Sequence, residues 1–175
     1  MLRVGADPGE FKTAFAVVEI QRRARVLEVG SWLNEGLAQN LERLFERWSI
    51  DEAIVEGVGR PWNKRIPPEA LRRLQGVVEE IVGFFRARGL PFREVLASGS
   101  VLWQEVGDLG WRQRLTGLTK PNEEDVFFTL MAWRRAGSLE GRIPHHSHIV
   151  DAIGMTLFDL SIEPGGFALL TQTRS

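Results

Sequence analysis

Three apolar, β-prone runs follow one another at the start of the chain, with only short polar breaks between them. They cover residues 2–7, 11–20 and 25–32, and the first break is Pro8-Gly9, a dipeptide typical of turns. Such short connections leave room only for tight turns between neighbouring strands. The sequence therefore predicts an antiparallel meander of three strands.

The spacing of apolar residues then changes. Residues 34–48 repeat leucine and aromatic side chains at helical spacing, and residues 52–56 (EAIVE) return to a strand pattern. A helix between two strands implies a parallel crossover, so the fourth strand can lie beside the first. The remaining segments are predicted as a helix over 67–88, a strand over 91–96, a short helix over 100–106, a loop over 107–120, and helices over 121–136 and 149–162, the last with Ser147 as its N-cap.

These elements predict an α/β fold around a five-stranded mixed sheet. The first three strands are expected to be antiparallel, and strands 1, 4 and 5 parallel, with helices flanking the sheet. At 175 residues the chain is long enough for one domain with a complete core. We expect that domain to span residues 1–163, followed by a loosely held tail over 164–175.

Composition limits the chemistry that is available. There is no cysteine, so disulfides and thiolate metal sites are excluded and any metal must be held by oxygen or imidazole. No apolar stretch approaches the roughly 20 residues of a membrane helix, and the first residues lack a signal-peptide core. We expect a soluble, cytoplasmic protein, acting in a host cytoplasm if a phage encodes it. The net charge of −1 alone indicates no nucleic-acid partner.

Two carboxylates stand at the ends of predicted strands. Alternation places Asp7 on the same face of the first strand as Arg3 and Gly5, and it places Glu56 with Ile54 on one face of the fourth. If these strands are parallel neighbours, Asp7 and Glu56 lie side by side at the carboxyl end of the sheet. Open α/β sheets bind their ligands at that edge.

Two further candidate ligands open the last predicted helix. His148 and Asp151 are three residues apart, so they project from one face of its first turn. Burying unpaired carboxylates is costly, and a divalent cation removes that cost. Carboxylates suit Mg²⁺ or Mn²⁺, and imidazole is acceptable to Mn²⁺. The sequence predicts a metal site for cutting phosphodiesters, built from Asp7, Glu56, His148 and Asp151.

Each of the four residues can also have a purely structural role without a metal. Asp7 before Pro-Gly can be a turn-forming aspartate, and Glu56 can be an ordinary glutamate at a sheet edge. Asp151 can be an early-helix acid favoured by the helix dipole, and His148 an exposed residue of the first turn. The combination of all four, in this topological order, favours the metal site.

Basic side chains cluster in two runs near the candidate ligands. Residues 60–73 carry five basic residues and one acid, and residues 111–120 carry three basic residues and no acid. One such run is usually a solvated face, but two beside a metal site favour a groove that faces phosphates. The basic residues concerned are Arg60, Lys64, Arg65, Arg72, Arg73, Arg112, Arg114 and Lys120.

These motifs resemble those of the RuvC-type Holliday-junction resolvases in the RNase H-like superfamily. The resemblance runs from GADPG through IVEGV and the helix after it to HIVDAIG. It implies that Asp7, Glu56, His148 and Asp151 bind two Mg²⁺ ions, with Mn²⁺ as a substitute, and that Asp7 bridges them. It implies a structure-selective DNA endonuclease of recombination and repair, which resolves four-way junctions by paired symmetric nicks and leaves 5′-phosphate and 3′-hydroxyl ends.

The resemblance also implies a role for several other residues. Lys120 occupies the position of a basic residue that helps at the scissile phosphate, and Trp62 lies in the loop that resembles the family's junction-entering loop, although it can also be an ordinary core or surface tryptophan. A further lysine of the family has no counterpart in residues 101–106. A homodimer is implied, and the apolar stripe of 67–89 either forms its interface or covers the sheet.

Other functions fit parts of this pattern. A related RNase H-like nuclease would act on RNA or an RNA–DNA hybrid, and a binding module would recognise branched DNA without cutting it. Sugar-kinase and actin-like ATPases share the fold and an Asp-x-Gly turn, but they need two such domains. The sequence does not decide whether His148 is a metal ligand or moves protons near the nucleophile.

Overall fold

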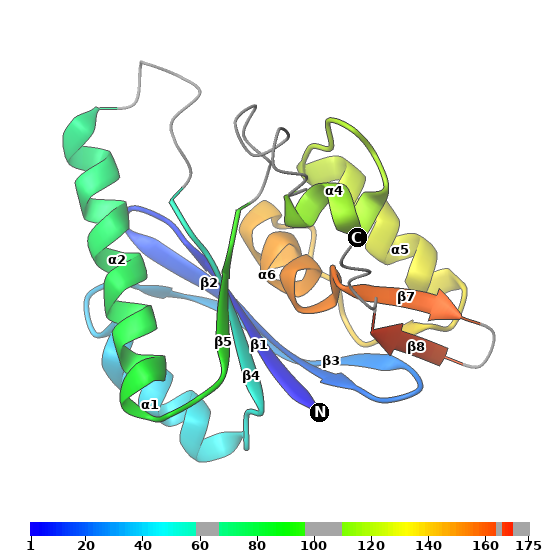
Figure 1. Ribbon diagram of the computed structural model, residues 1–175, viewed down its shortest axis with the longest axis horizontal. Helices are drawn as coiled ribbons and strands as arrows, with labels where there is room; N and C mark the ends of the chain where they lie inside the picture. The colour runs from blue at the N-terminus through cyan, green and yellow to red at the C-terminus, as the bar shows by residue number, and fades with distance from the viewer. Residues whose placement is uncertain (59–66, 97–109, 164–165, 170–175) are drawn as a thin grey trace, which may run out of the picture.

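The computed structural model describes residues 1–58, 67–96, 110–163 and 166–169. A six-stranded mixed sheet lies at the centre, with helices on both faces (Figure 1). Its strands, in the spatial order β5-β4-β1-β2-β3-β6, are β5 (Phe92–Val95), β4 (Glu52–Glu56), β1 (Leu2–Pro8), β2 (Lys12–Ile20), β3 (Ala24–Leu33) and β6 (Leu139–Glu140). The helices are α1 (Leu37–Arg47), α2 (Pro68–Ala87), α4 (Trp111–Thr116), α5 (Glu123–Arg135) and α6 (Ser147–Leu157).

The pairing of the first five strands confirms the predicted topology. β1 and β2 are antiparallel, as are β2 and β3, while β4 lies parallel to β1 with Ala6 opposite Val55. β5 is parallel to β4. The sixth strand, β6, pairs with β3 and was not predicted, because two residues are too few to show a period.

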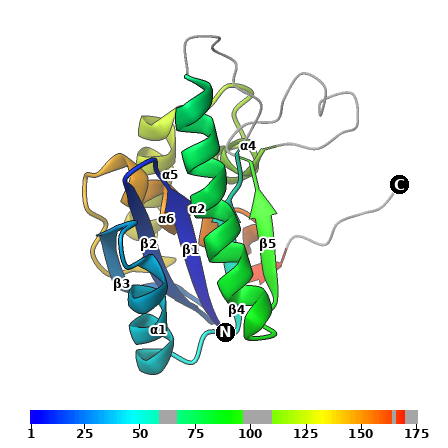
Figure 2. The same ribbon diagram turned by 90° about the vertical axis from the view of Figure 1, so that its left-hand side faces the viewer.

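Each face of the sheet carries its own hydrophobic core. α1 and α2 cover one face, and α6 packs directly on the other with α4 and α5 outside it (Figures 1 and 2). Val4 and Ala6 belong to the first core, whereas Ile54 belongs to the second, as the alternation predicted. In α2 the stripe residues Val78 and Phe85 are buried in the first core, so this part of the stripe covers the sheet.

Glycine allows α6 to lie very close to β1. A Cβ atom on Gly5 would come within 2.1 Å of the carbonyl oxygen of Ala152 in α6. On the opposite side of the helix, a Cβ on Gly154 would lie 2.8 Å from the ring of Trp111 in α4. The helix is therefore sandwiched between the sheet and α4 without room for larger residues at these two positions.

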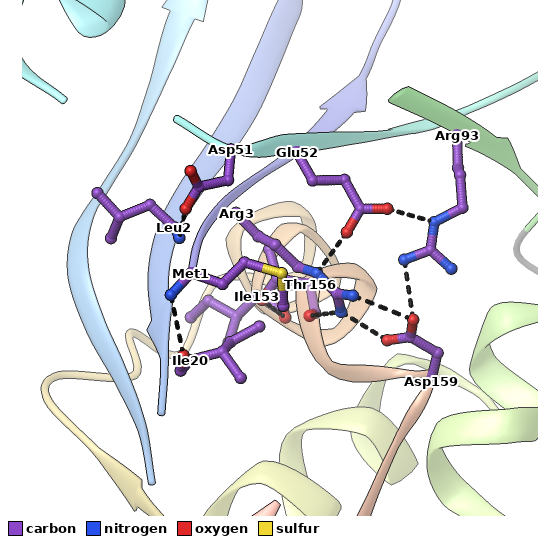
Figure 3. Close-up of polar contacts among 10 residues, drawn as sticks. All are labelled: Met1, Leu2, Arg3, Ile20, Asp51, Glu52, Arg93, Ile153, Thr156 and Asp159. Atoms are coloured by element: carbon purple, nitrogen blue, oxygen red, sulfur yellow. Dashed lines mark hydrogen bonds and ion pairs between the residues drawn. The ribbon is translucent and has the colours of Figure 1, made fainter. Parts of the chain in front are cut away.

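A buried ionic network holds the far end of α6 (Figure 3). Arg3, only 2% exposed, pairs with Asp159 just after the helix at 2.6 Å and with Glu52 at 2.7 Å. It also donates a 3.0 Å hydrogen bond to the carbonyl oxygen of Thr156. Arg93 joins the same two acids from β5. Because its residues come from four segments, the network ties β1, β4, β5 and the end of α6 together.

The structure corrects two predicted elements. The segment 107–120, predicted as a loop, contains α4, because Trp111 and Leu115 lie one helical turn apart and are both buried. The last helix ends at Leu157 and not at residue 162, since Arg3 binds the Thr156 carbonyl where the helix stops. The chain then forms a hairpin of β7 (Leu160–Glu163) and β8 (Gly166–Leu169), the second strand of which falls within the predicted tail.

His146, not Ser147, is the N-cap residue of α6, and its side chain makes no capping hydrogen bond. The short helix predicted over 100–106 falls outside the described residues. In the part of the chain that the structure describes, no helix has both the length and the apolar character needed to cross a bilayer.

Candidate active site

The carboxyl ends of β1 and β4 bring two of the predicted ligands to one edge of the sheet. Asp7 and Glu56 each follow directly after the paired residues Ala6 and Val55. Both side chains lie on the face covered by α6, because Gly5 and Ile54 two positions earlier face that helix. Asp7 is 6% exposed, so its carboxylate is largely shielded from water.

α6 supplies the other two predicted ligands from its first turn. The Nδ1 atom of His148 lies 2.7 Å from Oδ2 of Asp7, a contact between residues 141 positions apart in the sequence. Asp151, one turn further, is 1% exposed. The close packing of α6 on Gly5 is what allows this turn to reach the end of β1.

α4 completes the cluster with two consecutive residues. The indole Nε1 of Trp111 donates a 3.1 Å hydrogen bond to Oε2 of Glu56. The guanidinium of Arg112 forms an ion pair with the carboxylate of Asp151. Each of these α4 side chains thus holds a different candidate ligand.

The buried carboxylates strongly affect one another. Burial, and then the charge of Asp7, raises the pKa of Glu56 from 4.5 to about 8, although Arg112 and Trp111 lower it. Burial also raises the pKa of Asp151 from 3.8 to about 7, against the lowering effect of Arg112. The hydrogen bond to Asp7 raises the pKa of His148. The proximity of the three carboxyl groups of Asp7, Glu56 and Asp151 therefore favours binding of a cation or a proton.

The donor set fits a divalent metal. The carboxylate oxygens of Asp7, Glu56 and Asp151 are the hard ligands that Mg²⁺ and Mn²⁺ prefer. Among the described residues, Oδ1 of Asp151 is a buried acceptor without a hydrogen-bond partner, and it is free to coordinate an ion. In the described part of the chain, however, no three His, Asp or Glu side chains already converge on one ion position. Binding an ion would therefore need these side chains to come closer together.

The predicted basic residues are spread over several places. Arg72 and Lys120 are exposed, and Arg114 is half-buried. Arg73 of α2 pairs with Glu10 in the turn after Asp7, so it fixes α2 to the edge of the site. Arg112 faces the carboxylates. Four predicted DNA contacts, Arg60, Trp62, Lys64 and Arg65, lie outside the described residues.

A cleft lies beside His148, on the side of the β1–β2 turn. Lys12 and His146 line it together with the exposed ring of Phe11, of which 68% is accessible. This cleft reaches His148, and Glu10 adds a carboxylate to its lining.

The sequence prediction missed the role of Trp111 and the contact of Arg112 with Asp151. Both follow from α4, which was expected to be loop because three glycines occur between residues 107 and 117. The apolar pair Trp111 and Leu115, flanked by Gly110 and Gly117, was the local signal for a short helix.

The similarity of this chain to known proteins lies in its fold. No protein-family model matches the sequence, and no curated protein matches it. The RuvC structure from Thermus thermophilus superposes with a TM-score of 0.66 at 17% identity, over 91% of this chain and 93% of that one. The chain has the RuvC-type, RNase H-like fold.

Other solved structures share the RuvC-type fold. The T. thermophilus RuvC in complex with a Holliday junction substrate gives a TM-score of 0.66 at 16% identity, covering 91% of this chain and 92% of that chain. The yeast mitochondrial Holliday junction resolvase Ydc2 gives 0.54 at 12% identity, with 87% and 75% of the two chains covered. In all of these comparisons the match extends over most of the chain.

Proposed function

We propose that this protein is a metal-dependent endonuclease that resolves four-way DNA junctions. The observation that carries the proposal is that α6 brings His148 within 2.7 Å of Asp7, and Asp151 close enough for its charge to act on Glu56, at the carboxyl end of the sheet. The fold supports it, because structures of similar fold include a RuvC bound to a Holliday junction substrate.

The residues of the cluster have distinct tasks in this mechanism. Two divalent ions would supply an activated water and a counter-charge for the leaving oxygen of an in-line displacement. Asp7, Glu56 and Asp151 would hold them. His148 either adds a ligand or moves a proton at Nδ1, the atom that faces Asp7 in this structure. The products would be a 5′-phosphate and a 3′-hydroxyl.

DNA binding would rest on charge and on shape. Arg72 at the start of α2 and Lys120 before α5 are exposed cations able to contact backbone phosphates, and such contacts weaken with salt. Lys120 would act close to the scissile phosphate. The charge contacts fix position without reading bases, so junction geometry would provide the selectivity.

Paired nicks in a two-fold symmetric junction call for two active sites related by the same symmetry. We infer that the working form is a homodimer. Sedimentation of the protein alone and with junction DNA would measure this. A monomer that makes paired nicks at full rate on dilution would contradict it.

The deciding experiment is cleavage of an end-labelled four-way junction in Mg²⁺ or Mn²⁺, compared with linear duplex. We expect paired symmetric nicks on the junction, none on the duplex and none with the Asp7→Asn variant. Binding to the junction without cutting would identify a binding module. If neither occurs, RNA and RNA–DNA hybrids become the substrates to test.

A further inference from the structure

Arg112 occupies one side of the Asp151 carboxylate, which a bound metal ion would share. Its guanidinium is the cation that faces Asp151, and the side chain is only 18% exposed. The pair is deep, since the Asp151 side chain is 2% exposed. A divalent ion bound at the free Oδ1 of Asp151 would lie close to the guanidinium at Oδ2 of the same carboxylate, and two cations at such short range repel each other.

The surroundings of Arg112 suit a side chain with two positions. Among the described residues, its Nε–H is a buried donor that makes no hydrogen bond. The guanidinium lies 5.5 Å from the ring of Trp111, which is fixed by its own hydrogen bond to Glu56. Trp111 is thus held in place, whereas Arg112 has a donor left to use in another position.

We propose that Arg112 is a placeholder cation, which neutralises Asp151 in the metal-free protein and is displaced when a divalent ion binds. This rests on the proposed function, because it assumes that Asp151 is a metal ligand. Once displaced, the guanidinium turns its donors to the DNA phosphate at the site. A planar guanidinium suits this role, because it binds carboxylate and phosphate oxygens with the same pair of donors.

The proposal predicts that removing Arg112 strengthens metal binding. In the Arg112→Gln variant the ion no longer competes with a guanidinium, so we expect the Kd for Mn²⁺, measured by calorimetry without DNA, to fall by about ten-fold, equivalent to 1.4 kcal/mol. Cleavage of the junction at saturating Mn²⁺ should nevertheless decrease, since the phosphate contact is lost. Arg112→Lys should recover part of both effects.

The control is Arg135→Gln, which removes the same charge at the exposed end of α5 and should leave both measurements unchanged. NMR of arginine Nε–H groups in the wild type gives a second readout. The Arg112 signal should shift during a Mg²⁺ titration without DNA, and the Arg3 signal should not.

The outcomes separate this inference from the proposed function. If the wild type binds Mn²⁺ and cuts the junction but Arg112→Gln binds Mn²⁺ equally or less tightly, the placeholder is wrong and Arg112 only supports Asp151. If Arg112→Gln does not fold, the wild type decides instead. An Arg112 signal that does not move during its Mg²⁺ titration would also show that the placeholder is wrong. If the wild type binds no metal, the proposed function itself fails.

Discussion

Arg3 and Asp7 project from the same face of β1 and bind opposite ends of α6. Arg3 donates to the carbonyl oxygen of Thr156 in the last turn at 3.0 Å, and Asp7 contacts His148 in the first turn at 2.7 Å. Gly5 lies between them and lets the helix touch the strand. One strand thus fixes both ends of the helix that carries two candidate ligands.

Gly5→Ala should disrupt this arrangement. The added methyl group would lie 2.1 Å from the Ala152 carbonyl oxygen, so α6 must move away from β1. We expect a loss of about 1–3 kcal/mol in the free energy of unfolding and loss of junction cleavage. Chemical denaturation measures the first. Gly76→Ala is the control. Gly76 is an exposed residue of α2, and nothing lies within 4 Å of the added Cβ, so this change should raise the free energy of unfolding by about 0.5–1 kcal/mol.

Asp159→Asn should strongly destabilise the fold. It removes the charge that Arg3 and Arg93 share, so the buried guanidinium of Arg3, 2% exposed, keeps its pair with Glu52 but loses its pair with Asp159. Breaking a buried pair from one side costs about 3–5 kcal/mol. In the exposed pair of Arg23 and Glu140, the matched change Glu140→Gln should cost under about 1 kcal/mol. Equal effects of the two changes on thermal unfolding would rule out the network as a major source of stability.

The metal-free protein should lose stability as pH rises. The pKa of Glu56 is about 8 and that of Asp151 about 7 in the folded protein, both above their ordinary values of 4.5 and 3.8. Between the ordinary pKa and the raised pKa of each group, the folded chain binds more protons than the unfolded chain. The free energy of unfolding therefore falls as the pH rises through this range. The raised pKa of His148 acts in the same direction.

Melting temperatures in EDTA at pH 6 and pH 9 test this. We expect a decrease of several degrees, because 1 kcal/mol corresponds to about 2–4 °C in a domain of this size. Glu56→Gln should show a smaller decrease, and saturating Mg²⁺ should reduce it in the wild type. A melting temperature that rises between the two pH values would contradict the raised pKa values.

Trp111→Phe should shift the acidic limb of the cleavage pH profile to higher pH. The indole hydrogen bond lowers the pKa of Glu56, so without it Glu56 ionises at higher pH, while the phenyl ring retains most of the buried contact. Trp48→Phe is a matched control, since its indole donates to Glu28 at 2.8 Å, away from the cluster. An unchanged profile in Trp111→Phe would show that Glu56 ionisation does not limit the rate.

The sequence predicted the sheet order around β1 and the placement of Asp7 and Glu56. Side chains alternate between the two faces of a strand, and a helix between two strands allows few arrangements of those strands. α4 was missed because a six-residue helix between glycines carries too short a period. The Arg3 network could not be predicted either. Its partners Glu52 and Asp159 lie 49 and 156 positions away, and their pairing is a property of the complete fold.

The contact between Asp7 and His148 also sets the time at which the cluster can exist. Asp7 leaves the ribosome before His148, which follows 141 positions later. A nascent chain with the meander already folded still lacks α6, so it has neither the second pair of candidate ligands nor the helix that closes the core. Prematurely terminated products that end before His148 would therefore lack α6 and two of the four candidate ligands, however well their first strands pair.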